Sequence, residues 1–155
     1  MSGPVTLLGF DVGSRRIGVA VGNTVSESAR EVGVLDVHAG GPDWPRLDRW
    51  VRDWRPEALV VGDPVPADGG DQPARQRARG FARELAKRYA LPVEQVDEGR
   101  SSIEAAQRFA AGRAAGARKR SQAELLDAGA AVVILERWLA DPAGRIPFDP
   151  GKPTP

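Results

Sequence analysis

Hydrophobic positions in much of the chain come in short runs, which predict β-strands. Five strands are expected, at residues 5–11, 17–21, 32–37, 58–61 and 92–97. Short polar links separate the first three, which favours an antiparallel meander. The run at 58–61 is continuously apolar, as is typical of a strand buried on both faces.

Helical periodicity appears between and after these runs. Residues 44–54 and 74–89 place apolar side chains every three or four positions, which predicts two amphipathic helices. Two capping-box sequences, which begin at Ser101 and Ser121, predict two further helices. The order of elements therefore predicts an α/β fold: a mixed five-stranded sheet, three antiparallel strands and then parallel strands, with helices on both faces.

Length and composition fit one domain with an ordinary core, since the chain has 155 residues, of which 41% are hydrophobic and 28% charged. We assign this domain to residues 1–140. Residues 141–155 contain five prolines, so we expect a flexible or extended tail there. Loops are expected at 40–43 and 62–73, which are rich in glycine, proline and aspartate.

Several classes of protein are disfavoured by what the sequence lacks. Without cysteine there is no disulfide, no thiolate metal site and no cysteine nucleophile. The first residues do not resemble a signal peptide, and no apolar run approaches the ~20 residues of a membrane span. A formal net charge of +1 does not by itself indicate a nucleic-acid binder, although arginine dominates the 22 basic residues.

Three acids stand where the local pattern is otherwise apolar: Asp11, Glu98 and Asp127. Carboxylates at strand ends and on a helix face can converge on hard divalent cations such as Mg²⁺, and a pair of such ions suits the cleavage of phosphodiesters. Each acid also has a simpler interpretation. Asp11 fits a hairpin turn, Glu98 a solvated position before a helix, and Asp127 an exposed helix edge.

Basic residues near these acids suggest phosphate binding. Gly13 permits a tight turn after the first strand, and Arg16 could clamp a phosphate there. Ser101 is first a helix cap. Lys119, flanked by two arginines, precedes the helix that carries Asp127.

A basic stripe repeats every four residues along the helix at 74–89. Its members are Arg75, Arg79, Arg83 and Lys87. The stripe favours a solvated helix face, with contacts to a nucleic-acid backbone as the alternative. His38 is the only histidine, so a zinc site built on paired histidines is not expected.

Five motifs in register closely resemble the YqgF family, whose members are also called RuvX-type Holliday-junction resolvases or pre-16S rRNA nucleases and share the ribonuclease H-like fold. The motifs are DVGSRRIGVA at 11–20, VVGDP at 60–64, DG at 68–69, DEGRSS at 97–102 and DAGAA at 127–131. Each motif alone is weak, but their order and spacing hold across residues 5–140.

The resemblance implies a cytoplasmic bacterial nuclease that acts at the 5′ end of pre-16S rRNA, or alternatively on branched DNA. It places the catalytic and metal-binding triad on Asp11, Glu98 and Asp127, with Mg²⁺ or Mn²⁺, two ions, as the cofactor. The nucleic-acid contacts are expected at Arg15, Arg16, Arg100, Ser101, Arg118, Lys119 and Arg120. Ribosomal precursor particles are a possible partner, no membrane is involved, and the chain is expected to be a monomer or a weak homodimer.

Two positions depart from the family pattern. Gly99 stands where an arginine usually follows the Asp–Glu pair, and Asp63 stands where a leucine usually lies between glycine and proline. Asp63 could tune metal binding or repel phosphate. A non-catalytic nucleic-acid-binding module is the serious rival interpretation. An actin-like ATPase is not, because 155 residues leave no room for a second lobe.

Overall fold

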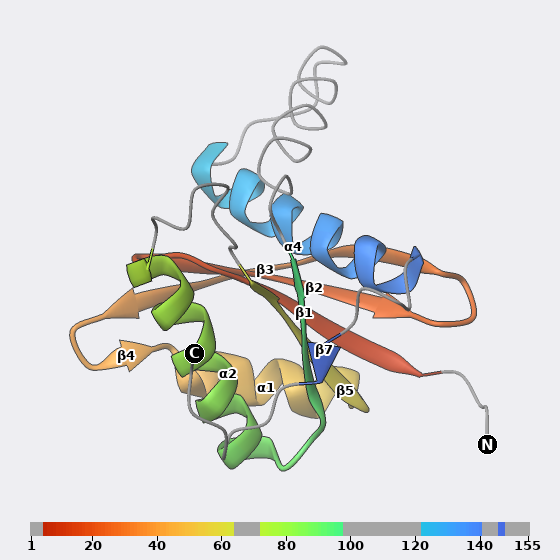
Figure 1. The fold of residues 1–155 in the computed structure, drawn as a ribbon, viewed down its shortest axis with the longest axis horizontal. Helices are drawn as coiled ribbons and strands as arrows, with labels where there is room; N and C mark the ends of the chain where they lie inside the picture. The colour runs from red at the N-terminus through yellow and green to blue at the C-terminus, as the bar shows by residue number, and fades with distance from the viewer. Residues whose placement is uncertain (1–4, 64–71, 98–121, 141–145, 148–155) are drawn as a thin grey trace.

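Residues 5–63, 72–97, 122–140 and 146–147 are described by the computed structural model. They form one mixed sheet with the strand order β4-β3-β2-β1-β5-β6-β7, together with three helices (Figure 1). The strands are β1 (Thr6–Val12), β2 (Arg16–Asn23), β3 (Ser28–His38), β4 (Gly41–Pro42), β5 (Ala58–Asp63), β6 (Val93–Asp97) and β7 (Ile146–Pro147). The helices are α1 (Trp44–Trp54), α2 (Gln72–Tyr89) and α4 (Gln122–Ala140).

The predicted mixed topology is confirmed. Strands β1, β2 and β3 pair antiparallel, while β1, β5 and β6 run parallel. Strand β3 begins at Ser28, four residues before the predicted start at 32. The prediction began late because the first residues of the strand are mostly polar and form no apolar run. The helix expected to begin at Ser101 lies outside the described residues.

Two short strands were not predicted. Gly41–Pro42 form β4 within the expected loop at 40–43 and pair with β3. Ile146–Pro147 form β7 within the expected tail and pair antiparallel with β6. Strands of two residues are too short to show a periodicity, so only their partners in the sheet reveal them.

Helices cover both faces of the sheet, as predicted, and alternate residues of the strands face each side. Leu8 and Phe10 of β1 join the core that contains Leu47 of α1 and Phe81 of α2. Leu7 joins the core formed with α4 on the other face. This alternation decides which strand-end side chains can meet which helix.

Helix α1 begins and ends at the predicted residues. Asp43 caps it by accepting a hydrogen bond from the Arg46 backbone N–H, and Arg55 ends it in the left-handed conformation. The tryptophans at 44, 50 and 54 are partly buried and pack against the core.

Helices α1 and α2 are joined by a polar contact centred on Asp48. Arg88 donates two hydrogen bonds to its carboxylate, at 2.9 and 2.8 Å, and the Tyr89 hydroxyl donates a third at 2.6 Å. The Arg88 hydrogen bonds, followed by that of Tyr89, lower the pKa of Asp48 to about 2. Burial, together with the hydrogen bond to Asp48, raises the pKa of Tyr89.

Candidate active site

Three parallel strands carry an acidic residue at or next to their last position, so these acids lie at the same end of the strands. Asp11 is the penultimate residue of β1, and Asp63 and Asp97 are the last residues of β5 and β6. Asp63 and Asp97 are paired in the register of the two strands. The carboxyl ends of parallel strands are a common place for ligand sites, so this end of the sheet is the first candidate.

Asp11 belongs to the face of the sheet that α4 covers. On β1, Leu7 packs in the α4 core, and a side chain at Gly9 would point toward Leu135 of α4. Asp11 follows in the same alternation, and its side chain is half-buried. On β2, Arg16 shares this face with Ala20, which also packs in the α4 core.

Helix α4 packs closely on β1 and β2 at positions where glycines of the strands face it. A Cβ atom at Gly9 would overlap Leu135 Cγ, and one at Gly22 would lie 3.3 Å from Leu135 Cδ1. The glycines of the strands therefore permit the close approach of α4.

The direction of α4 brings its first turns toward the end of β1. Helix α4 runs in the opposite direction to β1, so the first turns of α4 lie toward the end of the sheet at which β1 finishes (Figure 1). Asp127 lies in the first half of α4, one turn before Ala131, which is fully buried against the sheet. Positions four apart share a helix face, so the backbone places Asp127 on the sheet side of α4.

The turn between β1 and β2 presents backbone and basic groups beside Asp11. The Gly13 N–H donates to the Arg16 carbonyl at 2.9 Å, and a Cβ at Gly13 would lie 2.8 Å from that oxygen. Glycine is therefore needed here for a tight turn. Arg15 is exposed in this turn, and Arg16 is the first residue of β2.

The remaining predicted site residues fall outside what the structure describes. They are Glu98, Arg100, Ser101, Arg118, Lys119 and Arg120, together with the side chain of Asp127. Among the described side chains no three His, Cys, Asp or Glu residues form a cluster. Of the predicted triad, Asp11 is the member whose side chain the structure describes, and its carboxylate is a hard donor that suits Mg²⁺ or Mn²⁺.

Asp63 has a different environment from the one expected. Its side chain faces α2 and is 5% exposed, and Arg75 donates to both of its oxygens, at 3.1 and 3.2 Å. Arg79 Nη2 lies 3.8 Å from the same carboxylate. The carboxylate is thus compensated by guanidinium groups, which removes the reason to expect repulsion of phosphate.

The same contacts correct the interpretation of the basic stripe. Arg75 and Arg79 are part of a largely buried ion cluster, since their side chains are 28% and 14% exposed. Periodicity showed that they share a helix face but could not show that an acid lies opposite. The sequence does contain a signal for this contact: an acid at the end of an apolar strand, Asp63, is followed in the next helix by two arginines four residues apart.

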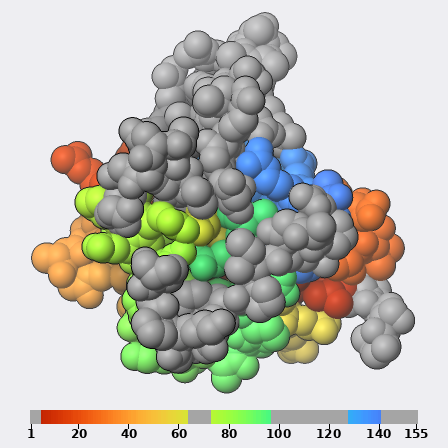
Figure 2. All heavy atoms as spheres, viewed as in Figure 1, coloured from red at the N-terminus to blue at the C-terminus, as the bar shows by residue number. Residues whose placement is uncertain are grey.

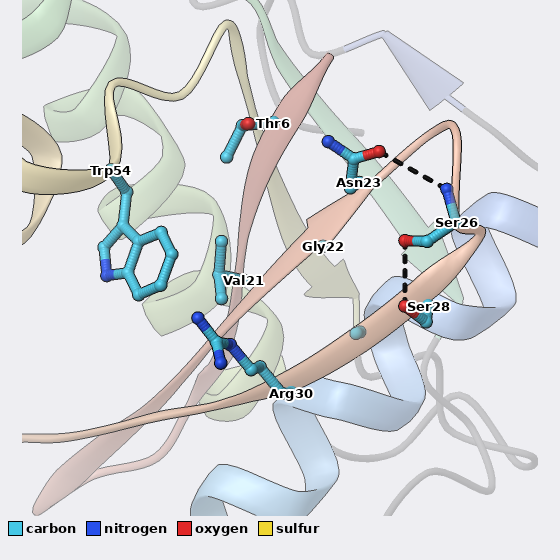
Figure 3. Close-up of a pocket in the computed structure, with 9 residues that line it drawn as sticks. Thr6, Val21, Gly22, Asn23, Ser26, Ser28, Arg30 and Trp54 are labelled. Atoms are coloured by element: carbon cyan, nitrogen blue, oxygen red, sulfur yellow. Dashed lines mark hydrogen bonds between the residues drawn. The ribbon is translucent and has the colours of Figure 1, made fainter. Parts of the chain in front are cut away.

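Two cavities flank the strands without containing the predicted acids. One of about 250 Å³ lies between α2 and the β3–β4 segment, which border each other in Figure 2, and its walls include Trp44 and Phe81. The other, of about 220 Å³, lies at the opposite end of β1 beside Thr6 and Trp54 (Figure 3). Its nine lining residues include no acid, so it offers no carboxylate for a divalent ion.

None of the described helices is long and apolar enough to cross a membrane.

The architecture is that of a ribonuclease H-like domain. The structure is similar to "Thermus thermophilus RuvC structure" (TM-score 0.52, 18% identity) and to "T. thermophilus RuvC in complex with Holliday junction substrate" (TM-score 0.54, 19% identity). Each comparison covers 92% of this chain and 99% of the other. At this identity the similarity establishes the fold.

The chain belongs to the RuvX family, described as Holliday junction resolvase, which matches residues 5–141. It is 64% identical over 137 residues to a "Putative pre-16S rRNA nuclease" of Xanthomonas axonopodis pv. citri (strain 306). It is 63% identical to the protein of the same name in Xanthomonas campestris pv. campestris (strain B100). Both alignments cover 88% of each chain.

Proposed function

We propose that this chain is a divalent-metal-dependent nuclease that hydrolyses phosphodiester bonds, with Asp11, Glu98 and Asp127 as its catalytic and metal-binding acids. The observation that carries this proposal is the position of Asp11. It stands at the carboxyl end of β1 on the face that α4 covers, and the first half of α4 contains Asp127.

Sequence phase supports the inclusion of Glu98. On β6, Glu94 faces α4, because its Oε1 accepts a hydrogen bond from Trp138 Nε1 at 2.9 Å. Val96 packs in the same α4 core. Glu98 itself lies outside the described residues, and in the sequence it follows Val96 by two positions.

The acids of this site are suited to Mg²⁺ or Mn²⁺, and two ions are proposed. When bound, such ions supply the acidity that activates a water molecule and stabilises the leaving 3′-oxygen. Arg15 and Arg16, on the turn beside Asp11, would position the nucleic-acid backbone. Arg100, Ser101 and the basic segment at 118–120 are proposed to complete these contacts.

We favour the 5′ end of pre-16S rRNA as the substrate. Proteins that are 63–64% identical to this chain over most of their length carry the name "Putative pre-16S rRNA nuclease". The function would then belong to ribosome biogenesis in the cytoplasm, with ribosomal precursor particles as partners. Trimming an RNA end requires one active site, so a monomer is sufficient.

Branched DNA is the second candidate. The family is described as Holliday junction resolvase, and the fold is similar to that of RuvC. Symmetric cleavage of a four-way junction needs two active sites, so this function requires a homodimer.

The decisive experiment compares wild type and Asp127→Asn on a labelled 16S rRNA precursor and on a four-way DNA junction, each with Mg²⁺ and with Mn²⁺. We expect cleavage of the RNA by wild type and its loss in the variant. Cleavage of the junction alone would favour the resolvase. Activity that survives the substitution would refute the triad, and binding without cleavage under either metal would favour a non-catalytic module.

A further inference from the structure

Two arginines of α2 lie against the Asp63 carboxylate. Asp63 contributes one negative charge, and Arg75 and Arg79 contribute one positive charge each. Arg75 alone donates to both carboxylate oxygens, one through Nε and one through Nη2. Asp63 is therefore already satisfied by a bidentate pair, which is the strongest geometry for these two groups.

Arg79 is bound much less completely. Its Nη2 lies 3.8 Å from Asp63 Oδ2, which is within electrostatic range but too long for a hydrogen bond. Its Nε is buried and has no hydrogen-bond partner among the described residues. The Arg79 side chain is 14% exposed, so its incompletely bound guanidinium is suited to donate to an anion that approaches from the surface.

A second donor on the same face also lacks an acceptor. Gln95 of β6 lies beside Val61 in the register and is 5% exposed, and its Nε2 has no partner among the described residues. Its neighbour Val93 packs in the α1–α2 core, so Gln95 faces α2, as Asp63 does. Two donors without acceptors lie on this face near the strand ends.

We propose that Arg79 binds a phosphate of the substrate strand, as a further nucleic-acid-binding residue of the proposed nuclease. The Asp63–Arg75 pair anchors the start of α2 to the end of β5 and thereby holds Arg79 at this edge. Asp11 occupies the same edge on the α4 face, so the bound phosphate is a neighbour of the cleaved one and not the cleaved one itself. The inference deepens the proposed function and rests on it.

The test measures binding of a fluorescent single-stranded RNA from the 16S precursor and of a four-way DNA junction across a range of salt concentrations. The Asp11→Asn background separates binding from cleavage. Arg79→Gln should weaken binding about tenfold. It should also reduce the slope of log K against log salt by about 0.7 on the RNA or about 0.9 on the DNA, which corresponds to one phosphate contact.

Arg77→Gln is the matched control. Arg77 is exposed on α2 and lies two residues away, which places it on the other side of the helix. It should leave the salt slope unchanged. Arg79→Lys keeps the charge but loses the planar fork, so it should retain the slope and bind several-fold more weakly; this variant serves if Arg79→Gln does not fold.

The outcomes separate the two proposals. A folded Arg79→Gln variant with an unchanged slope, or Arg79→Lys with unchanged affinity, would show that Arg79 only balances Asp63 and would overturn the inference. Absence of cleavage by the chain with its native Asp11, alongside a reduced slope in the variant, would refute the nuclease and leave the phosphate site standing.

Discussion

Asp11 and Asp63 end neighbouring parallel strands at the same edge of the sheet, but they face opposite sides. Asp11 is half-buried on the α4 face, whereas Asp63 is buried on the α2 face, where Arg75 binds both of its oxygens. The residue type and its position at a strand end are the same. The comparison teaches that the covering helix decides the role of a strand-end acid: α4 carries Asp127, the acid proposed to act with Asp11, and α2 contributes arginines.

The largest expected difference between the two acids is in catalysis. Asp11→Asn should reduce cleavage about a thousandfold or more, because the ligation of a catalytic metal contributes several kcal/mol to transition-state stabilisation. The thermal midpoint should change little, since Asp11 is only half-buried. Single-turnover cleavage rates and a thermal unfolding curve of the same preparation measure both effects.

Asp63→Asn is the control for that experiment. It removes the charge of the other strand-end acid and should lower the cleavage rate far less than Asp11→Asn. Equal losses in the two variants would break the comparison, because Asp63 would then also belong to the catalytic group.

For the free energy of unfolding we expect the reverse: changes at the Asp63 contact should matter more than changes at Asp11. Arg75→Ala should lower the free energy of unfolding by about 3 kcal/mol, because it leaves the buried Asp63 carboxylate without its bidentate partner. The double variant Asp63→Leu with Arg75→Met should recover most of this loss, since apolar residues can replace a buried ion pair. Urea-induced unfolding measures both. A loss below about 1 kcal/mol in Arg75→Ala would mean that the pair contributes no more than a surface pair does.

The sequence carried enough information to predict the mixed topology of the sheet, the limits of α1 and the position of Asp11 near a strand end. Each of these follows from local periodicity or from a turn. The Asp63–Arg75 contact could not be predicted in the same way, because periodicity identifies residues that share a face but not what lies opposite. The role of the glycines that face Leu135 could not be predicted for the same reason, because a close approach depends on two elements and the pattern of one element does not show which residue lies opposite.

The α4 face can be disturbed without touching Asp63. Gly9→Ala introduces a Cβ that overlaps Leu135, so α4 must shift away from β1. We expect a loss of about 2 kcal/mol in the free energy of unfolding, as for an overpacked core. A lower cleavage rate should accompany it, because the shift moves Asp127 relative to Asp11. Unfolding curves and cleavage rates check the two effects.

Gly40→Ala is the matched control, since a Cβ at Gly40 would meet no atom within 4 Å. It should be neutral in both measurements. A Gly9→Ala variant with reduced stability but full activity would show that the position of α4 over β1 does not set the geometry of the acids.

The smallest effect is expected at Asp48, which forms the same bidentate contact with an arginine as Asp63 does, but at the surface. Its side chain is 36% exposed, so solvent screens the pair, and we expect a contribution of about 0.5 kcal/mol. Its pKa is lowered to about 2 in the folded protein, mainly by the Arg88 hydrogen bonds. Protonation therefore favours the unfolded chain, so the contribution is present above about pH 4 and is lost as the pH falls toward about 2.

Free energies of unfolding of wild type and Asp48→Asn, measured near neutral pH and again near pH 2, should differ at the first pH and converge at the second. Asp53→Asn removes an exposed acid from the same helix and should leave the free energy of unfolding near neutral pH close to that of wild type. A difference for Asp48→Asn as large as that for Arg75→Ala would contradict the role given to burial, because two contacts of equal geometry would then contribute equally on the surface and in the interior.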